Sequence, residues 1–185
     1  MKKIILASGS PRRRELLKMA ELKFDICIKS VDESIPQGVE PEKAAQMNAR
    51  KKAAAVKGCC DDALIIGADT IVVLENQILG KPRDKAEACE MLKALSGNTH
   101  RVITGVCLAV NGEYRTFYEE TKVEFYELTD DEIRRYVSTG EPMDKAGGYG
   151  IQGKGCMLIK KFDGDYYNVV GLPVARLIRE MRKYL

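Results

Sequence analysis

The segment ALIIGADTIVVL, residues 63–74, indicates the fold class of this chain. Its first and last four residues are apolar, which is typical of a strand buried on both faces of a sheet. The residues Gly67, Ala68, Asp69 and Thr70 interrupt the apolar run, so we expect the strand to break there. Helices have to cover such a strand, and the segment therefore predicts an α/β protein.

Strands and helices alternate on either side of this segment, and some strands are expected to pair antiparallel. The dipeptide Asn111-Gly112 lies between two β-rich runs and predicts a hairpin. Pro11 at a first helical position and a capping box from Thr129 to Glu132 indicate two helix starts. The expected strands cover residues 4–7, 24–28, 101–110, 114–126 and 157–162, and the expected helices cover residues 12–20, 41–57, 84–95, 129–138 and 173–184.

Length and composition are those of an ordinary globular protein. The 185 residues, of 20.6 kDa, suggest a single domain over residues 1–185. A net charge of +3 is too small for a dedicated binder of nucleic acid or of membrane surfaces, so neither is expected as a partner. The apolar run at residues 4–7 is too short for a secretion signal, and no run approaches the 18 residues of a spanning helix. We therefore expect a cytoplasmic protein.

The cysteines and the single histidine exclude several kinds of site. The six cysteines are scattered without a C-x-x-C pair, so zinc-finger spacing is absent and we expect reduced cysteines that pack in the interior. With His100 as the one histidine, a Ser-His-Asp or Cys-His hydrolase has little support. Any general base is therefore expected to be a carboxylate. The cysteines are Cys27, Cys59, Cys60, Cys89, Cys107 and Cys156.

The turn from Ser8 to Arg13 joins the first strand to a helix N-terminus. Such a junction offers unpaired backbone N–H groups and the positive end of the helix dipole. The two hydroxyls of Ser8 and Ser10 and the guanidiniums of Arg12 and Arg13 add donors for an anion. The turn predicts either a phosphate site or a capped helix with a solvated basic first turn.

Asp69 is the second candidate, because a carboxylate within an apolar strand is costly to bury unless it is paired, protonated or bound to a metal. The alternative is a turn at which Asp69 reaches solvent. Lys81 follows in LGKP and could pair with Asp69 or with a phosphate, or be solvated. The residues 141–155 contain five glycines, which permit close approach to a ligand or form a flexible loop. Up to this point the residues predict an enzyme or binder for an anionic small molecule.

Four segments together closely resemble the Maf family of nucleotide pyrophosphatases. They are LASGSPRRRELL (residues 6–17), IGADTIVV with ILGKP (66–82), ALSGNTHRVITGVCL (94–108) and GEPMDKAGGYGIQGKG (140–155). The resemblance implies a fold similar to that of inosine triphosphate pyrophosphatases, with a bent mixed β-sheet flanked by helices and two lobes around a cleft. It implies hydrolysis of a nucleoside triphosphate to its monophosphate and pyrophosphate, with a divalent metal cation, Mg²⁺ or Mn²⁺.

The resemblance also assigns roles to residues. Asp69 matches the catalytic aspartate and, with Glu33, the metal-binding positions. Lys52 is adjacent to Arg50 and Lys51, so a slip of one residue would change its assignment. The implied substrate-binding residues are Ser8, Arg12, Arg13, Lys52, Thr70, Lys81 and Gln152.

Gln152 carries the expected base preference. Its segment Tyr149 to Gln152 matches the subgroup resembling dTTP/UTP pyrophosphatases, and an amide can both accept from and donate to a pyrimidine ring. The alternative for Gln152 is that it only ties its loop to the backbone. Alternative functions are a 7-methyl-GTP pyrophosphatase and a non-catalytic, nucleotide-responsive regulator of septum formation. A homodimer is left open.

Overall fold

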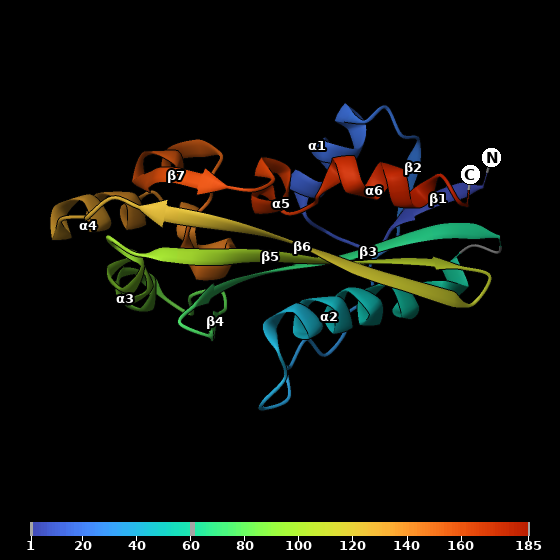
Figure 1. The fold of residues 1–185 in the computed structure, drawn as a ribbon, viewed down its shortest axis with the longest axis horizontal. Coiled ribbons are helices and arrows are strands. Elements are labelled where there is room, and N and C mark those ends of the chain that lie inside the picture. Colours follow the sequence, from blue (N-terminus) through green and yellow to red (C-terminus); the bar gives the residue numbers. More distant parts are fainter. Residues whose placement is uncertain (1, 60–61, 185) are drawn as a thin grey trace. The chain divides into compact units, whose positions relative to one another are not determined.

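The computed structural model describes residues 2–59 and 62–184 and contains a mixed sheet with helices on its faces (Figure 1). The sheet has seven strands in the order β2-β1-β3-β5-β6-β7, with β4 paired to β3. Strand β1 runs parallel to β2 and β3, whereas β4 and β7 pair antiparallel with β3 and β6. The predicted α/β fold with a mixed sheet flanked by helices is confirmed.

The chain divides into two compact units, as the predicted two lobes require. Three long strands, β3, β5 and β6, contribute residues to both units. The first unit comprises Met1–Thr70, Thr104–Glu119 and Gly171–Leu185, and the second comprises Ile71–Ile103 and Glu120–Val170.

The first unit contains the parallel part of the sheet and three α-helices. No helix in the described part of the chain is long and apolar enough to cross a membrane. The elements of the first unit, including the strands that it shares with the second, are β1 (Lys3–Leu6), α1 (Pro11–Met19), β2 (Phe24–Ile26), α2 (Pro41–Ala55), the 3₁₀ helix η1 (Lys57–Cys59), β3 (Ala63–Leu74), β5 (Thr99–Val110), β6 (Glu113–Phe125) and α6 (Val174–Met181).

Strand β3 is continuous through Gly67 and Asp69, so the predicted break was wrong. A Cβ at Gly67 would lie 2.2 Å from the carbonyl oxygen of Ala49 in α2, and one at Gly105 in β5 would lie 2.3 Å from the carbonyl carbon of Ala45. The two glycines therefore let α2 lie directly on the sheet. The departure from an apolar pattern marks a close helix contact, not an interruption of the strand.

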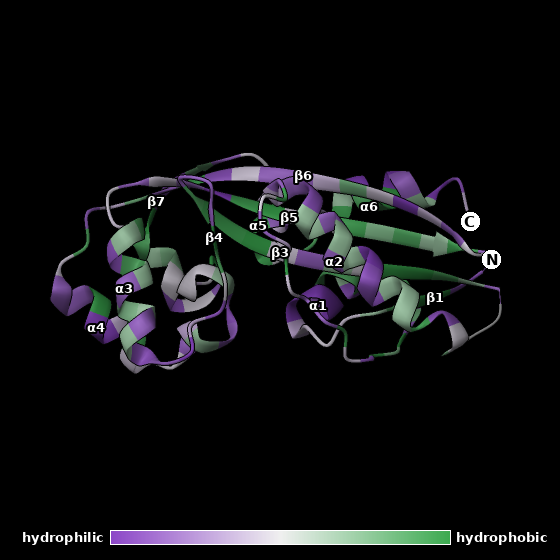
Figure 2. Ribbon diagram, turned by 90° about the horizontal axis from the view of Figure 1, so that it is seen from below, coloured by the Kyte–Doolittle hydropathy of each residue, from purple (hydrophilic) through white to green (hydrophobic). Residues whose placement is uncertain are grey.

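The opposite face of the first unit is covered by α1 and α6 (Figure 1). Side chains alternate along β6, and the Arg50 guanidinium of α2 lies 5.0 Å from the Tyr114 ring centre while Arg176 of α6 lies 5.0 Å from that of Phe117. Tyr114 and Phe117 are an odd number of positions apart and so lie on opposite faces. Figure 2 shows that β3 and β5, between these helix layers, are largely hydrophobic.

The second unit packs two helices and the glycine-rich segment around one core. Phe125, Ile133, Tyr136 and Tyr149 belong to this core, with Leu92 of α3. Strand β4 and helix α5 were not predicted, since each is only three to five residues long. The elements are β4 (Gln77–Leu79), α3 (Lys85–Leu95), α4 (Asp130–Ser138), the 3₁₀ helices η2 (Glu141–Asp144), η3 (Ala146–Gly148) and η4 (Gly153–Leu158), β7 (Ile159–Asp163) and α5 (Tyr166–Val170).

Local sequence signals are confirmed where they were specific. The Thr129 side chain accepts from the Glu132 N–H, and the Glu132 carboxylate accepts from the Thr129 N–H, which completes the capping box. Asn111 and Gly112 have φ values of 51° and 86°, as a tight hairpin turn requires.

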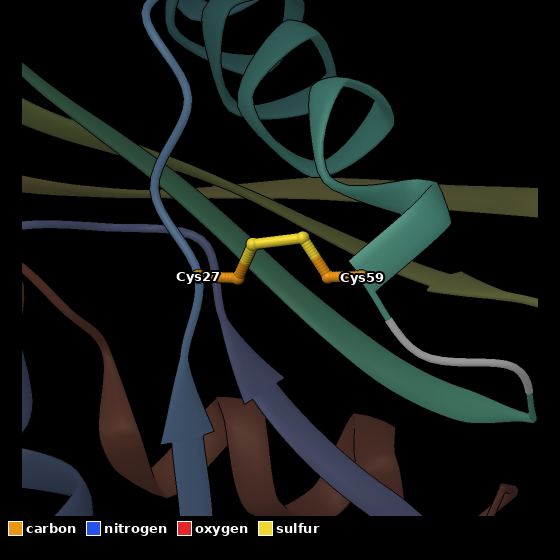
Figure 3. Close-up of a disulfide and its surroundings, with 2 residues drawn as sticks. All are labelled: Cys27 and Cys59. Carbon is orange, nitrogen blue, oxygen red and sulfur yellow. A yellow bond between two sulfur atoms is a disulfide. The ribbon is translucent and has the colours of Figure 1, made fainter.

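A disulfide joins Cys27, which follows β2, to Cys59 at the end of η1 (Figure 3). The expectation of reduced cysteines is wrong for this pair, because proximity across 32 residues leaves no pattern in the sequence. Cys89, Cys107 and Cys156 are free, and burial raises the pKa of the Cys107 thiol to about 12. Cys60 lies outside the described residues.

Candidate functional site

Asp69 lies on the α2 face of β3 and is only 7% exposed. Its Oδ1 atom accepts from Lys52 Nζ at 2.7 Å, and its Oδ2 atom accepts from Asn48 Nδ2 at 3.3 Å. Asn48 and Lys52 are four residues apart on α2 and so share one face of that helix. Because Gly67 precedes Asp69 by two positions on the same face, the close approach of α2 brings both side chains to the carboxylate.

Glu33 joins this group from the segment between β2 and α2. Its Oε2 atom lies 2.8 Å from Lys52 Nζ, and its backbone oxygen accepts from Asn48 Nδ2 at 3.0 Å. The Lys52 ammonium therefore bridges two carboxylates, of which that of Asp69 is nearly buried and that of Glu33 is half exposed. The sequence-based prediction that Asp69 and Glu33 belong to one site fits this geometry.

Lys52 is the member of the basic triplet that faces Asp69. The neighbouring Lys51 instead donates to the backbone oxygens of Asp32 at 2.9 Å and Ser34 at 3.2 Å. Arg50 lies over the Tyr114 ring. Helix geometry therefore brings Lys52, and neither Arg50 nor Lys51, to Asp69, while its assignment to substrate binding stays a prediction.

The turn that carries Glu33 is ordered by its own polar side chains. Asp32 Oδ1 accepts from the Ser34 N–H at 2.9 Å, and Asp32 Oδ2 accepts from Ser34 Oγ at 2.8 Å. These hydrogen bonds hold the pKa of the Asp32 carboxyl below its usual value. Together with Lys51, they fix the backbone on both sides of Glu33.

Thr70 follows Asp69 in β3 and therefore points to the opposite face, where it meets Arg13. Arg13 donates from Nη2 to Thr70 Oγ1 at 2.9 Å, from Nη1 to Ser8 Oγ at 3.0 Å and from Nε to the Gly171 oxygen at 2.8 Å. Thr70 Oγ1 also lies 2.9 Å from Thr104 Oγ1 of β5. Three of the predicted substrate-binding residues, Ser8, Arg13 and Thr70, thus form one hydrogen-bonded cluster.

The Arg13 guanidinium is buried at the start of α1. Burial lowers the pKa of Arg13, and the nearby carboxylates of Asp69 and Glu33 oppose that shift. Arg12, the preceding residue, is partly exposed. Pro11 is the first residue of α1, as predicted, while Ser10 makes no side-chain capping bond. Much of Arg13's donor capacity is therefore used to join the turn after β1, strand β3 and the backbone at Gly171, and Arg12 is the more exposed cation.

The oxygen-rich groups around Asp69 fit a hard divalent cation. Mg²⁺ is usually held by one or two carboxylates together with substrate phosphates, and Glu33 and Asp69 supply such a pair. The Asn48 Oδ1 atom is buried and has no hydrogen-bond partner among residues 2–59 and 62–184, so a further oxygen lies beside Asp69. No group of three or more His, Cys, Asp or Glu side chains suited to a metal occurs in the described chain, so a metal here would rely on the phosphates for remaining ligands.

Lys81 and Gln152 lie in the second unit. Lys81 is exposed, and the backbone oxygen of the preceding Gly80 accepts from the Gly147 N–H at 3.0 Å. Gln152 is partly exposed and immediately precedes η4. The loop of Lys81 is thus attached to the same glycine-rich segment that carries Gln152. The partner of Asp69 in an ion pair is Lys52, not Lys81.

His100 is buried in the second unit and shares a hydrogen bond of 2.6 Å between its Nε2 and the Tyr149 hydroxyl. Burial lowers the pKa of His100 to about 4. The ring is therefore neutral near pH 7 and packs edge-on against Phe125 and Tyr149. This role agrees with the expectation that a carboxylate, and not the histidine, acts as a base.

Asn48 was missed from the sequence although a signal was present. It lies within an alanine-rich helix between Ala45 and Ala49, which are fully buried. A polar side chain at that spacing has to face the sheet, where it needs a partner. Thr104 was also missed, since a threonine in a strand carries no signal of its own.

Comparison with known proteins places the chain in one family. Residues 3–184 match the Maf family model, described as Maf-like protein. A protein of Bacillus cytotoxicus named dTTP/UTP pyrophosphatase is 52% identical over 184 residues, which cover 100% of this chain and 96% of the relative, and one of Bacillus anthracis is equally similar. A structural match, the Ham1 protein of Staphylococcus aureus, has a TM-score of 0.49 and 16% identity over 85% of this chain and 80% of its own. On the full-length family match and these identities, this chain belongs to the Maf family.

Proposed function

We propose that this protein hydrolyses nucleoside triphosphates, with dTTP and UTP as preferred substrates, to the monophosphate and pyrophosphate. The observation that carries the proposal is the Asp69 carboxylate, nearly buried and held between the Lys52 ammonium and the Asn48 amide. A fixed carboxylate beside a cation suits the attack of water on an anionic phosphate. The relatives that share half of the sequence are named dTTP/UTP pyrophosphatases.

In the proposed reaction, water attacks the α-phosphorus and pyrophosphate leaves. Asp69 accepts the proton of the attacking water, since a carboxylate with remaining lone pairs can act as a general base. Lys52, Arg12, Arg13 and Lys81 hold the phosphates and balance the negative charge that develops on the leaving group. Ser8 and Thr70 orient Arg13 through the hydrogen bonds described above, and their hydroxyls can also contact phosphate oxygens.

A divalent cation, Mg²⁺ or Mn²⁺, belongs to the proposal, with Glu33 and Asp69 as its protein ligands. When bound, such a cation neutralises phosphate charge and acidifies water. The Lys52 ammonium lies between the same two carboxylates. Lys52 is then expected to shift its contact toward the substrate when the phosphates arrive.

Base preference is proposed to depend on Gln152. Its amide can donate to a ring carbonyl and accept from the N3–H of uracil or thymine, a pairing for which both halves of the amide are needed. A glutamate at this position could not donate when ionised.

The protein is further proposed to act in the cytoplasm, where its substrates are made.

A nucleotide panel tests the proposal. The purified protein would be incubated with dTTP, UTP, dCTP, dATP, GTP and 7-methyl-GTP, and the nucleotide products separated by chromatography. We expect monophosphate and pyrophosphate from dTTP and UTP, no diphosphate intermediate, and release by Asp69→Asn that is slower by about 10²–10⁴ for every triphosphate. Nucleotide binding without turnover would favour a regulator instead, and a preference for 7-methyl-GTP would overturn the base assignment.

Light scattering on the same preparation distinguishes a monomer from the homodimer left open above.

A further inference from the structure

The loop that carries Gln152 is tied at one end to the Glu141 carboxylate. Glu141 Oε2 accepts from the Lys154 N–H at 3.0 Å, and Glu141 Oε1 accepts from the Gly155 N–H at 3.1 Å. Hydrogen bonds from backbone N–H groups to an ionised carboxylate are stronger than those between neutral groups. Both backbone groups that follow Gly153 are therefore held by a single side chain.

The other end of the same loop is tied to Tyr136. The Tyr136 hydroxyl accepts from the Gly150 N–H at 3.2 Å and donates to Glu141 Oε1 at 3.0 Å. A chain of hydrogen bonds thus runs from Gly150 through Tyr136 and Glu141 to Gly155, and it brackets Gln152. Burial raises the pKa of the Tyr136 phenol, so this hydroxyl keeps the proton that it donates to Glu141.

The two ends of the loop also lie in direct contact. A Cβ at Gly155 would lie 2.3 Å from the Gly150 oxygen and 2.7 Å from the Tyr136 hydroxyl, so no larger residue fits there. Gly153 has a φ of 73°, a conformation that glycine adopts without strain. A loop with three glycines in six residues has many conformations when it is free, and it needs outside contacts to keep one.

Glu141 is itself held in place. Its backbone oxygen accepts from Lys145 Nζ at 2.7 Å, and it begins η2 shortly after the end of α4, the helix that carries Tyr136. Tyr136 is only 4% exposed and packs in the core of the second unit. These hydrogen bonds therefore connect the Gln152 loop to the hydrophobic core of that unit.

We propose that Glu141 and Tyr136 are positioning residues that fix Gln152 for selection of the nucleotide base. The inference rests on the proposed function, since it assigns a substrate contact to Gln152. Neither Glu141 nor Tyr136 contacts the substrate: they act by holding the backbone on both sides of Gln152. Loss of either residue leaves the phosphate end of the reaction intact and weakens the choice between bases.

The test compares specificity constants for dTTP, UTP and dCTP in the parent, Tyr136→Phe, Glu141→Gln and Gln152→Ala. The phenylalanine keeps the packed ring and removes the hydroxyl, and the glutamine turns an N–H₂ group toward backbone donors. Each single variant is expected to raise KM for dTTP and UTP about 3–10-fold with little change in kcat, because a hydrogen bond to the base acts equally on substrate and transition state. Tyr118→Phe, which removes the hydroxyl of an exposed tyrosine, is the matched control.

The double variants Tyr136→Phe/Gln152→Ala and Glu141→Gln/Gln152→Ala decide whether the pair acts through Gln152. We expect the ratio of dTTP to dCTP specificity constants in each to equal that of Gln152→Ala alone. Additive changes in the ratio of dTTP to dCTP specificity constants would overturn the inference. An unchanged ratio in both Tyr136→Phe and Glu141→Gln would overturn it as well. Hydrogen exchange of the Gly150, Lys154 and Gly155 amides should accelerate in Tyr136→Phe and Glu141→Gln and not in Tyr118→Phe. If the parent hydrolyses no triphosphate, the proposed function fails; if it is active and selective but the ratios behave additively, only this inference fails.

Discussion

Lys52 Nζ lies 2.7 Å from Asp69 Oδ1, and the two side chains are only 15% and 10% exposed. The pair joins α2 to β3 in the interior of the first unit. A buried ion pair costs desolvation energy, and removal of one partner leaves the other charge uncompensated. The arrangement is therefore typical of a site in which stability is given up so that charges are ready for a substrate.

Lys52→Met should lower the free energy of unfolding by about 3 kcal/mol, because it leaves the Asp69 carboxylate buried without its paired ammonium, while the Asn48 amide still donates to it. Urea unfolding measures the effect. The double variant Lys52→Met/Asp69→Asn should recover part of the loss, since it removes the second charge. Strictly additive effects would show that the two groups do not stabilise each other.

Chelation should abolish turnover, and Mg²⁺ or Mn²⁺ should restore it. Glu33→Gln should raise the metal concentration needed for half-maximal activity about tenfold or more, because one of two carboxylate ligands is lost. Cys156→Ser, which changes an exposed free thiol, should not alter the metal requirement. Full activity in excess chelator would refute the assignment of Glu33 and Asp69.

Stability should fall as the pH is lowered from about 7 to about 4, in part because of His100. The pKa of His100 is about 4 in the folded chain and about 6.5 when unfolded, so the unfolded state binds the extra proton in this range. The loss of unfolding free energy from His100 approaches ~3 kcal/mol over the whole range, and this loss is complete once the pH is below the folded pKa.

His100→Gln is the comparison for this effect. Its unfolding free energy, measured in urea at pH 7, 6 and 5, should depend less on pH than that of the parent. Parallel pH dependences would mean that His100 does not account for the loss. Activity should not require the histidine, because its ring faces Tyr149 and Phe125 and not Asp69.

Cys27→Ser/Cys59→Ser should lower the unfolding free energy by about 2–4 kcal/mol in the absence of reductant, because the disulfide closes a long loop. That loop contains Glu33, Asn48 and Lys52, so the change also tests how far the site depends on the tether. Dithiothreitol should bring the parent to the stability of the variant. Equal stability of parent and variant without reductant would show that the bond does not form.

Prediction from the sequence succeeded where one local rule acts alone. The capping box at Thr129 and the hairpin at Asn111-Gly112 depend only on neighbouring residues, and both are as expected. Asp69 could be singled out because a carboxylate in an apolar run needs an explanation. The break predicted at Gly67 was wrong because the reason for that glycine, contact with α2, lies far away in the sequence.

Features that depend on two distant segments could not be predicted. The Asn48 amide contacts Asp69 only because α2 packs on β3. The disulfide between Cys27 and Cys59 forms only because β2 and η1 are neighbours. The hydrogen bonds of Glu141 depend likewise on a loop that returns to it 13 and 14 residues further along the chain. A polar residue on the buried side of an alanine-rich helix was the one signal that was available and not used.

The most direct test of the central claim is the turnover number of Asp69→Asn with dTTP at saturating metal, together with its circular dichroism and unfolding transition. The account predicts that the variant stays folded and that kcat falls by about 10²–10⁴, as expected when a general base is lost. Lys52 then still has Glu33 as a partner. A folded Asp69→Asn with a kcat close to that of the parent would contradict the claim that Asp69 is the catalytic carboxylate.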